Sequence, residues 1–211
     1  MLKQKLFILP GLLFLLNVQL VFAQLKVTQL TKKDIPANIK YTGHIINALR
    51  FIDADGEHLI ITTETGKTPS KNKDFDGKDA ALYAYHYKIN GADFKLTWQT
   101  YDFEKDCPFD VNVNFLPNTF AVTDLNNDGK AEVWLTYKIT CRSDVSPATM
   151  KIIMHDGDKK YAIRGENKVK VSATEYMGGA YKFDETFKAG PEVFRLYAAK
   201  LWKKNILENW K

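Results

Sequence analysis

The chain has few cysteines and lacks the common catalytic signatures. Only two of its 211 residues are cysteine, Cys107 and Cys141. Their separation excludes a Cys-x-x-Cys redox pair, and two cysteines alone do not make a metal site. There is no Gly-x-Ser-x-Gly elbow, no His-Glu-x-x-His pair, no phosphate-binding glycine loop and no dinucleotide fingerprint. The four histidines are dispersed, and we expect none of them to act as a catalytic base: His44, His58, His86 and His155.

The first residues have the pattern of an export signal. Lys3 and Lys5 precede an apolar run from Leu6 to Leu16, and Val21-Phe22-Ala23 resembles a small-residue cleavage site. An uncleaved anchor is the alternative, but the run is short and interrupted by polar residues, glycine and proline. We therefore expect cleavage after Ala23. The mature chain, 24–211, has no other run long enough to span a bilayer, so we expect a periplasmic, cell-surface or secreted protein.

The charge of the chain gives no sign of a nucleic-acid partner. Removal of residues 1–23 takes away Lys3 and Lys5 and lowers the formal net charge from +5 to +3. The remaining lysines are scattered and form no basic stripe interleaved with aromatic residues. At this length a single domain is expected.

Export also bears on the two cysteines. In an oxidising compartment Cys107 and Cys141 are expected to form a disulfide, the alternative being two buried small hydrophobic residues. Such a bridge closes a loop of about 35 residues and would stabilise the fold by roughly 3–4 kcal/mol in the chain-entropy model.

An oxygen-rich loop in the middle of the chain has the spacing of a calcium site. Calcium takes several oxygen ligands, and a tight loop presents alternate side chains to one point. A glycine, Gly129, falls where the backbone must turn sharply. The expected ligands are Asp124, Asn126, Asp128, the carbonyl of Lys130 and Glu132. The alternative is a plain Asp-Gly hairpin without metal.

The loop lies between two runs that alternate like strands, 121–123 and 132–138. It resembles the calcium loop of integrin-type FG-GAP and VCBS repeats, whose pattern is roughly Asp-x-Asp-x-Asp-Gly-x-x-Asp between propeller strands. Asn126 and Glu132 depart from that pattern, and both keep an oxygen. The resemblance implies a structural calcium ion.

The flanks of this loop have a counterpart earlier in the chain. When 48–64 is placed over 121–137 the Asp-Gly pairs coincide, and in both copies two further strand runs separated by a tight turn follow. We therefore predict a mainly β fold with two propeller-blade-like, four-stranded antiparallel units, at about 41–104 and 118–176. Two blades cannot close a propeller, so the units form either a sandwich or an open pair. Apolar residues at helical spacing predict one covering helix at about 191–209.

Two places could contact a ligand. Tyr83, Tyr85 and Tyr87 share one face of a strand, where aromatic rings either stack on sugars or fill a core. In the polar segment after Cys141, Arg142 and Asp144 either bind a ligand or cap the loop.

Several segments together are similar to a small family of exported bacterial proteins named for surface polysaccharide biosynthesis. The segments are 122–134, Cys141-Arg-x-Asp-Val-Ser-Pro-x-x-Met-Lys151 and Lys160-Tyr-Ala-x-Arg-Gly165. The family name implies no catalytic residues. Our first hypothesis is a non-catalytic binding or scaffold protein that contacts a surface glycan or envelope protein. The second is a carbohydrate-active hydrolase with a carboxylate pair, and the third is a purely structural domain.

Overall fold

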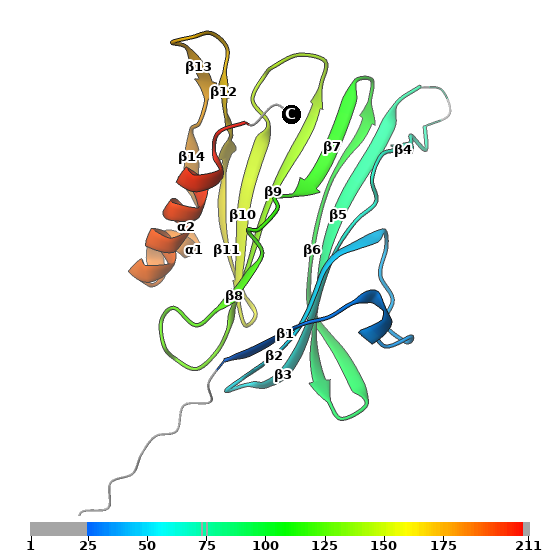
Figure 1. Cartoon of the computed structure of the whole chain (residues 1–211), viewed down its shortest axis with the longest axis vertical. Coiled ribbons are helices and arrows are strands. Elements are labelled where there is room, and N and C mark those ends of the chain that lie inside the picture. Colours follow the sequence, from blue (N-terminus) through cyan, green and yellow to red (C-terminus); the bar gives the residue numbers. More distant parts are fainter. Residues whose placement is uncertain (1–24, 73, 75, 209–211) are drawn as a thin grey trace, which may run out of the picture.

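The structure, a computed structural model, describes residues 25–208 except 73 and 75. The predicted signal peptide, 1–23, lies outside the described residues. The described chain forms two antiparallel six-stranded sheets, a short two-stranded ribbon and two C-terminal α-helices (Figure 1). The mainly β fold expected from the sequence is confirmed. Within the same residues, no helix has the length and apolar character needed to cross a membrane.

The first sheet, sheet A, contains the N-terminal strands. Their order is β1-β2-β3-β5-β4, and β6 pairs with the other edge of β5. The longest hairpin joins β5 to β6 through Gly91, whose φ of +60° suits a residue without a Cβ. The bounds are β1 Lys26–Gln29, β2 His44–Asp53, β3 Gly56–Glu64, β4 Thr68–Pro69, β5 Lys78–Asn90 and β6 Asp93–Cys107. A 3-10 turn, Lys32–Asp34, lies between β1 and β2.

The second sheet, sheet B, follows in sequence. Its order is β14-β11-β10-β9-β7, and β8 shares one edge of β9 with β7. The bounds are β7 Asp110–Phe115, β8 Ala121–Thr123, β9 Glu132–Arg142, β10 Thr149–Asp156, β11 Lys159–Glu166 and β14 Tyr181–Phe183. The separate ribbon consists of β12 Lys168–Lys170 and β13 Tyr176–Gly178.

Four strands pair in the same order in each of the two sheets. In sheet A, β2, β3, β5 and β6 pair in chain order, and in sheet B β8, β9, β10 and β11 do the same. The turn after β2 and the loop after β8 occupy corresponding places. Additional strands differ, because β1 and β4 extend sheet A whereas β7 and β14 extend sheet B.

A hydrophobic core lies between the sheets, because alternate residues of each strand point to opposite faces. Ile60 and Leu82 of sheet A belong to the same buried cluster as Val113, Leu135 and Ile153 of sheet B. The two sheets therefore pack face to face. This core holds the two halves of the molecule together by burial of apolar surface.

Each sheet also buries part of its outer face. The helices α1, Glu185–Ala189, and α2, Glu192–Asn205, cover sheet B on the side away from sheet A (Figure 1). Phe194, Ala198 and Trp202 recur every four residues, so they line one stripe of α2, and all three are buried. On sheet A, the segment before β2 packs over Tyr85 and Tyr87 and leaves the far end of that face uncovered.

The C-terminal helix ends earlier than expected. We predicted helix to about residue 209, whereas α2 ends at Asn205 and the short helix α1 precedes it. The reason is a competing extended pairing. Lys168 donates its N–H to the carbonyl of Ile206 (2.7 Å) and accepts an N–H from Glu208 (2.8 Å), which draws the chain out of the helix.

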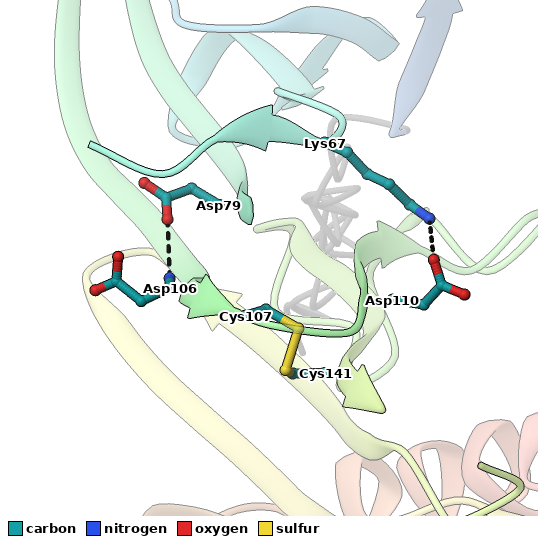
Figure 2. The surroundings of a disulfide bond; sticks show 6 residues. All are labelled: Lys67, Asp79, Asp106, Cys107, Asp110 and Cys141. Carbon is teal, nitrogen blue, oxygen red and sulfur yellow. Dashed lines mark hydrogen bonds and ion pairs between the residues drawn. A yellow bond between two sulfur atoms is a disulfide. The ribbon is translucent and has the colours of Figure 1, made fainter. Parts of the chain in front are cut away.

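Covalent and polar links also join the sheets. Cys107 at the end of β6 and Cys141 near the end of β9 form the expected disulfide (Figure 2). Beside it, Lys67 and Asp110 make an exposed ion pair at 3.1 Å. The carboxylate of Glu64 accepts the backbone N–H of Phe115 at 2.7 Å, which links β3 to β7. The relative position of the sheets is thus set at several points.

Candidate functional site

Four of the five predicted calcium ligands lie on the loop between β8 and β9, which contacts sheet A, and the fifth, Glu132, is the first residue of β9. Asp124 accepts backbone N–H groups from Asp128 and Gly129, both at 3.1 Å. Asp128 Oδ1 accepts the N–H of Lys130 at 2.8 Å, and Asp128 Oδ2 accepts the side-chain amide of Asn126. The loop is therefore folded by its own side-chain oxygens, as Asp and Asn do in tight turns.

Glu132 is placed differently from the other four residues. It is 1 % exposed and accepts bonds from the hydroxyl of Thr123 (2.6 Å) and the N–H of Leu125 (3.0 Å). Burial, and to a lesser degree the Asp124 carboxylate, raises the pKa of Glu132 to about 7, although its hydrogen bonds act in the opposite direction. Glu132 fastens the start of the loop to the start of β9.

The oxygens of the loop are thus engaged with the loop itself. Among residues 25–208, apart from 73 and 75, no group of three or more His, Cys, Asp or Glu side chains is arranged to hold a metal ion. The spacing matches a calcium loop, but this arrangement does not present the carboxylates to one point. Calcium binding by the loop stays a prediction.

A groove occupies the uncovered end of the outer face of sheet A. Its volume is about 390 Å³, and Tyr83, Tyr101 and Phe103 are among the residues that line it. Tyr83 lies directly opposite Tyr101 in the β5–β6 pairing, and their rings stack at 4.8 Å. Tyr101 in turn stacks on Phe103 at 5.0 Å. Tyr101 is 46 % exposed and Phe103 is 41 % exposed, so the platform is open to solvent.

Polar side chains surround this aromatic platform. Lys105 lies over the ring of Phe103 at 4.7 Å, a cation–π distance. Asp106 donates its backbone N–H to Asp79 at 2.9 Å and accepts the hydroxyl of Ser70 (Figure 2 shows the Asp79 contact). Other polar residues at the groove are Thr42, Thr65, Thr68, Lys71, Asn72 and Glu104. The groove therefore combines flat apolar rings with donors and acceptors around them.

The three tyrosines of β5, Tyr83, Tyr85 and Tyr87, do not share one environment. Tyr85 and Tyr87 are 6 % and 7 % exposed and belong to the outer core of sheet A. Tyr85 accepts the N–H of Thr42, and Tyr87 donates to the carbonyl of Lys40. Only Tyr83 reaches the groove. Tyr85 and Tyr87 are therefore held by the backbone of the covering segment, whereas Tyr83 is only partly buried and lines the groove.

The structure also brings together three histidines that are far apart in sequence. Five rings stack in a ladder between the sheets, in the order Phe51, His58, His86, Trp98 and His155, with neighbouring centroids 3.8–5.1 Å apart. We call this set the histidine ladder. It borders a cavity of about 80 Å³. The alternation of single strands cannot reveal the ladder, because the rings come from β2, β3, β5, β6 and β10.

Hydrogen bonds fix the rings of the ladder. His58 Nε2 lies 3.1 Å from Asp53 Oδ1, and His155 Nε2 lies 3.0 Å from the hydroxyl of Thr100. Burial lowers the pKa values of His86 and His155 to about 3, with nearby positive groups adding to the effect. These two imidazoles are therefore neutral at ordinary pH. His58, His86 and His155 are thus stacked and hydrogen-bonded within the ladder, and the absence of a catalytic histidine stays a prediction.

The loop after β9 is held by its own residues. Asp144 accepts the N–H of Ser146 at 2.9 Å, and Arg142 donates to the carbonyl of Ser146. Arg142 also lies 3.8 Å from the carboxylate of Glu208 near the C-terminus. The arrangement therefore includes the capping role considered for this segment.

Comparisons of this chain with protein-family models, with curated proteins and with solved structures found no match.

Proposed function

We propose that this chain is an exported, non-catalytic protein that binds a glycan of the cell surface or envelope through the groove on sheet A. The observation that carries the proposal is the row of stacked, solvent-exposed rings of Tyr83, Tyr101 and Phe103. The similarity of several segments to exported polysaccharide-associated proteins points to the same class of ligand.

The chemistry of the groove suits a saccharide. A sugar ring has one face of C–H groups, which packs on an aromatic ring, and a rim of hydroxyls, which need hydrogen-bonding partners. The Tyr101 and Phe103 rings supply the apolar surface, whereas Asn72, Asp79 and Lys105 supply polar groups at its edge. A volume of about 390 Å³ falls within the range of small-ligand sites.

The proposal also covers the architecture: the two sheets are a pair of propeller-blade-like repeats, and a calcium ion at the 124–132 loop stabilises them. The common pairing order of the two sheets supports the repeat. The loop touches sheet A through the bond from the N–H of Ala54 to the carbonyl of Gly129 (2.8 Å). An ion that stiffens the loop would therefore stabilise the contact between the two units.

The proposal is tested by affinity electrophoresis through gels that contain surface polysaccharide extracted from the source cells. Tyr101→Ala should weaken retardation by roughly three- to tenfold, since one stacking ring is lost. Tyr176→Ala on β13 is the matched control, because Tyr176 is also 46 % exposed and lies outside the groove. Equal retardation of the wild type and Tyr101→Ala would refute the groove as the binding site. Capture of an envelope protein that persists in Tyr101→Ala would favour the alternative partner.

A hydrolase that uses a carboxylate pair is the second candidate, because the same groove contains Asp79, Glu104 and Asp106. Release of reducing ends from the extracted polysaccharide separates the two functions. The binding proposal predicts no turnover by the wild type. Turnover that disappears in Glu104→Gln or Asp106→Asn, with unchanged thermal melting, would establish the enzyme instead.

A further inference from the structure

Three cations stand side by side on sheet B. Lys151 of β10 lies directly opposite Arg164 of β11, and Arg164 lies directly opposite Lys182 of β14. Residues that are directly opposite each other in antiparallel strands share a face of the sheet. Along β11, Lys160, Ala162 and Arg164 alternate onto one face. Ala162 is buried in the core between the sheets, so this is the inner face. We call Lys151, Lys160, Arg164 and Lys182 the cationic shelf.

The shelf extends beyond the edge of sheet A. β6, the edge strand, lies over β10, because Trp98 stacks on His155 and Asp102 contacts Lys151. β11 and β14 lie farther out in sheet B. The residues of the shelf on these two strands, Lys160, Arg164 and Lys182, are exposed. The shelf is thus open to solvent, with β6 along one side.

Asp102 pairs with one cation of the shelf, Lys151, and the other acidic groups nearby form no ion pair with the remaining three in the described part of the chain. Asp102 accepts bonds from both Lys151 Nζ (2.6 Å) and the hydroxyl of Tyr137 (2.9 Å). Asp184 caps α1 by accepting the N–H of Phe187. Glu166 is exposed on the same face. Within the part of the chain that the structure describes, the side chains of Lys160, Arg164 and Lys182 form no ion pair.

This arrangement of charge is unfavourable in the protein alone. Like charges directly opposite each other destabilise an antiparallel pair. Consistent with this, the pKa of Lys160 is lowered, first by partial burial and then by Arg164 and Lys151, although Asp102 and Asp184 act in the opposite direction. A bound anion would remove the repulsion. An arginine beside two lysines also suits an oxyanion, since the guanidinium can donate two parallel hydrogen bonds.

We propose that the cationic shelf binds an oxyanion group, the chemistry shared by carboxylate, sulfate and phosphate, carried by a ligand of this protein. The shelf lies on a different sheet from the aromatic groove, and the proposal does not depend on glycan binding there.

The test uses purified protein at low ionic strength and three probes: inorganic phosphate, an oligogalacturonate and the neutral maltohexaose. Calorimetric titration should show binding of at least one of the two anionic probes and none of maltohexaose at the shelf. The double variant Arg164→Gln/Lys182→Gln should lose about tenfold or more in affinity for that probe, because charge-assisted hydrogen bonds are removed. The control Lys200→Gln/Lys203→Gln removes the same charge from α2 and should bind within about twofold of the wild type.

Thermal melting provides a second readout that a structural role alone would not produce. Without ligand, Arg164→Gln/Lys182→Gln should melt at the same temperature as the wild type or higher, since repulsion is relieved. The anionic probe should raise the melting temperature of the wild type but not of this variant. Preference for oligogalacturonate assigns the group to a carboxylated chain, and preference for phosphate assigns a phosphorylated ligand. Absence of binding by both anionic probes, or equal loss in the α2 control, would overturn the proposal.

Discussion

Asp53 Oδ2 accepts a 2.8 Å hydrogen bond from the backbone N–H of Ala131, and both groups are buried. The same carboxylate holds His58 of the histidine ladder through Oδ1. One side chain of sheet A therefore fixes both the ladder and the end of the 124–132 loop. Its hydrogen bonds to His58 and Ala131 lower the pKa of Asp53, even though burial, the largest single effect, acts to raise it.

Replacement of Asp53 should be strongly destabilising. Asp53→Ala leaves the buried N–H of Ala131 and the ring of His58 without their partner, so we expect a loss of about 2–4 kcal/mol in the free energy of unfolding. Urea denaturation of the variant and the wild type measures this loss. Asp55→Ala serves as the control, because Asp55 is exposed and pairs with Lys88 at the surface, and should cost less than about 1 kcal/mol. Similar losses in the two variants would contradict this role of Asp53.

The histidine ladder should make the protein sensitive to acid. The folded pKa values of His86 and His155, about 3, lie below the ordinary value of 6.5, so the unfolded chain binds more protons between these limits. Their contribution to stability is complete above pH 6.5 and is lost as the pH falls toward 3. The raised pKa of Glu132 has the opposite sign between pH 4.5 and 7 and partly offsets this loss.

The variant His86→Phe separates the two effects, because it keeps a ring in the stack and removes one titrating group. Its partner Thr97 is exposed and can bond to water. Between pH 6.5 and 4.5 the variant should lose about 2–3 kcal/mol less stability than the wild type. Urea denaturation at a series of pH values checks the difference in slope, in which the Glu132 contribution cancels. Parallel curves would show that His86 does not titrate as stated.

The 124–132 loop should respond to calcium. We predict that chelation lowers the melting temperature of the purified protein and that Asp128→Ala removes this sensitivity, because one ligand is lost. Asp93→Ala, at the exposed start of β6, should leave the sensitivity intact. Melting at the same temperature with calcium and with chelator would show that the loop is a metal-free turn.

The disulfide should contribute substantially to stability. The double variant Cys107→Ala/Cys141→Ala should unfold with a loss of about 3–4 kcal/mol in the chain-entropy model. Alkylation of the unreduced, denatured protein followed by mass measurement should detect no free thiol. Two alkylated cysteines in protein purified under oxidising conditions would contradict the assignment.

Much of the local structure follows from residue pattern. The aromatic-rich run 81–89 and the alternating run 94–103 meet at Asn90-Gly91, and they form β5 and β6. Cys107 and Cys141 are bridged, as the export signal suggested. The C-terminal end of α2 was predicted less accurately. The backbone of Lys168, about 40 residues away, forms hydrogen bonds with Ile206 and Glu208 that compete with the helix.

The sites depend on information that a linear pattern does not contain. His58, His86 and His155 meet only because the registers of the β3–β5 and β5–β6 pairs and the packing of the two sheets align them. Tyr83 and Tyr85 share one face of β5, and the strand pattern does not reveal that the segment before β2 packs over Tyr85 while Tyr83 lines the groove. The repulsive row of Lys151, Arg164 and Lys182 likewise requires the β14 pairing, which joins residues from separate parts of the chain.

The alternation of β6 has a consequence for ligands of different length. Tyr101 and Phe103 point to the outer side of this edge strand, and Asp102 between them points inward against Lys151. A polymer wrapped around the strand would contact rings on one side and cations on the other, so the second contact would form at high local concentration. Long acidic chains would then bind far more tightly than their own monomers. The affinity of the protein would therefore depend on the length of the ligand as well as on its composition.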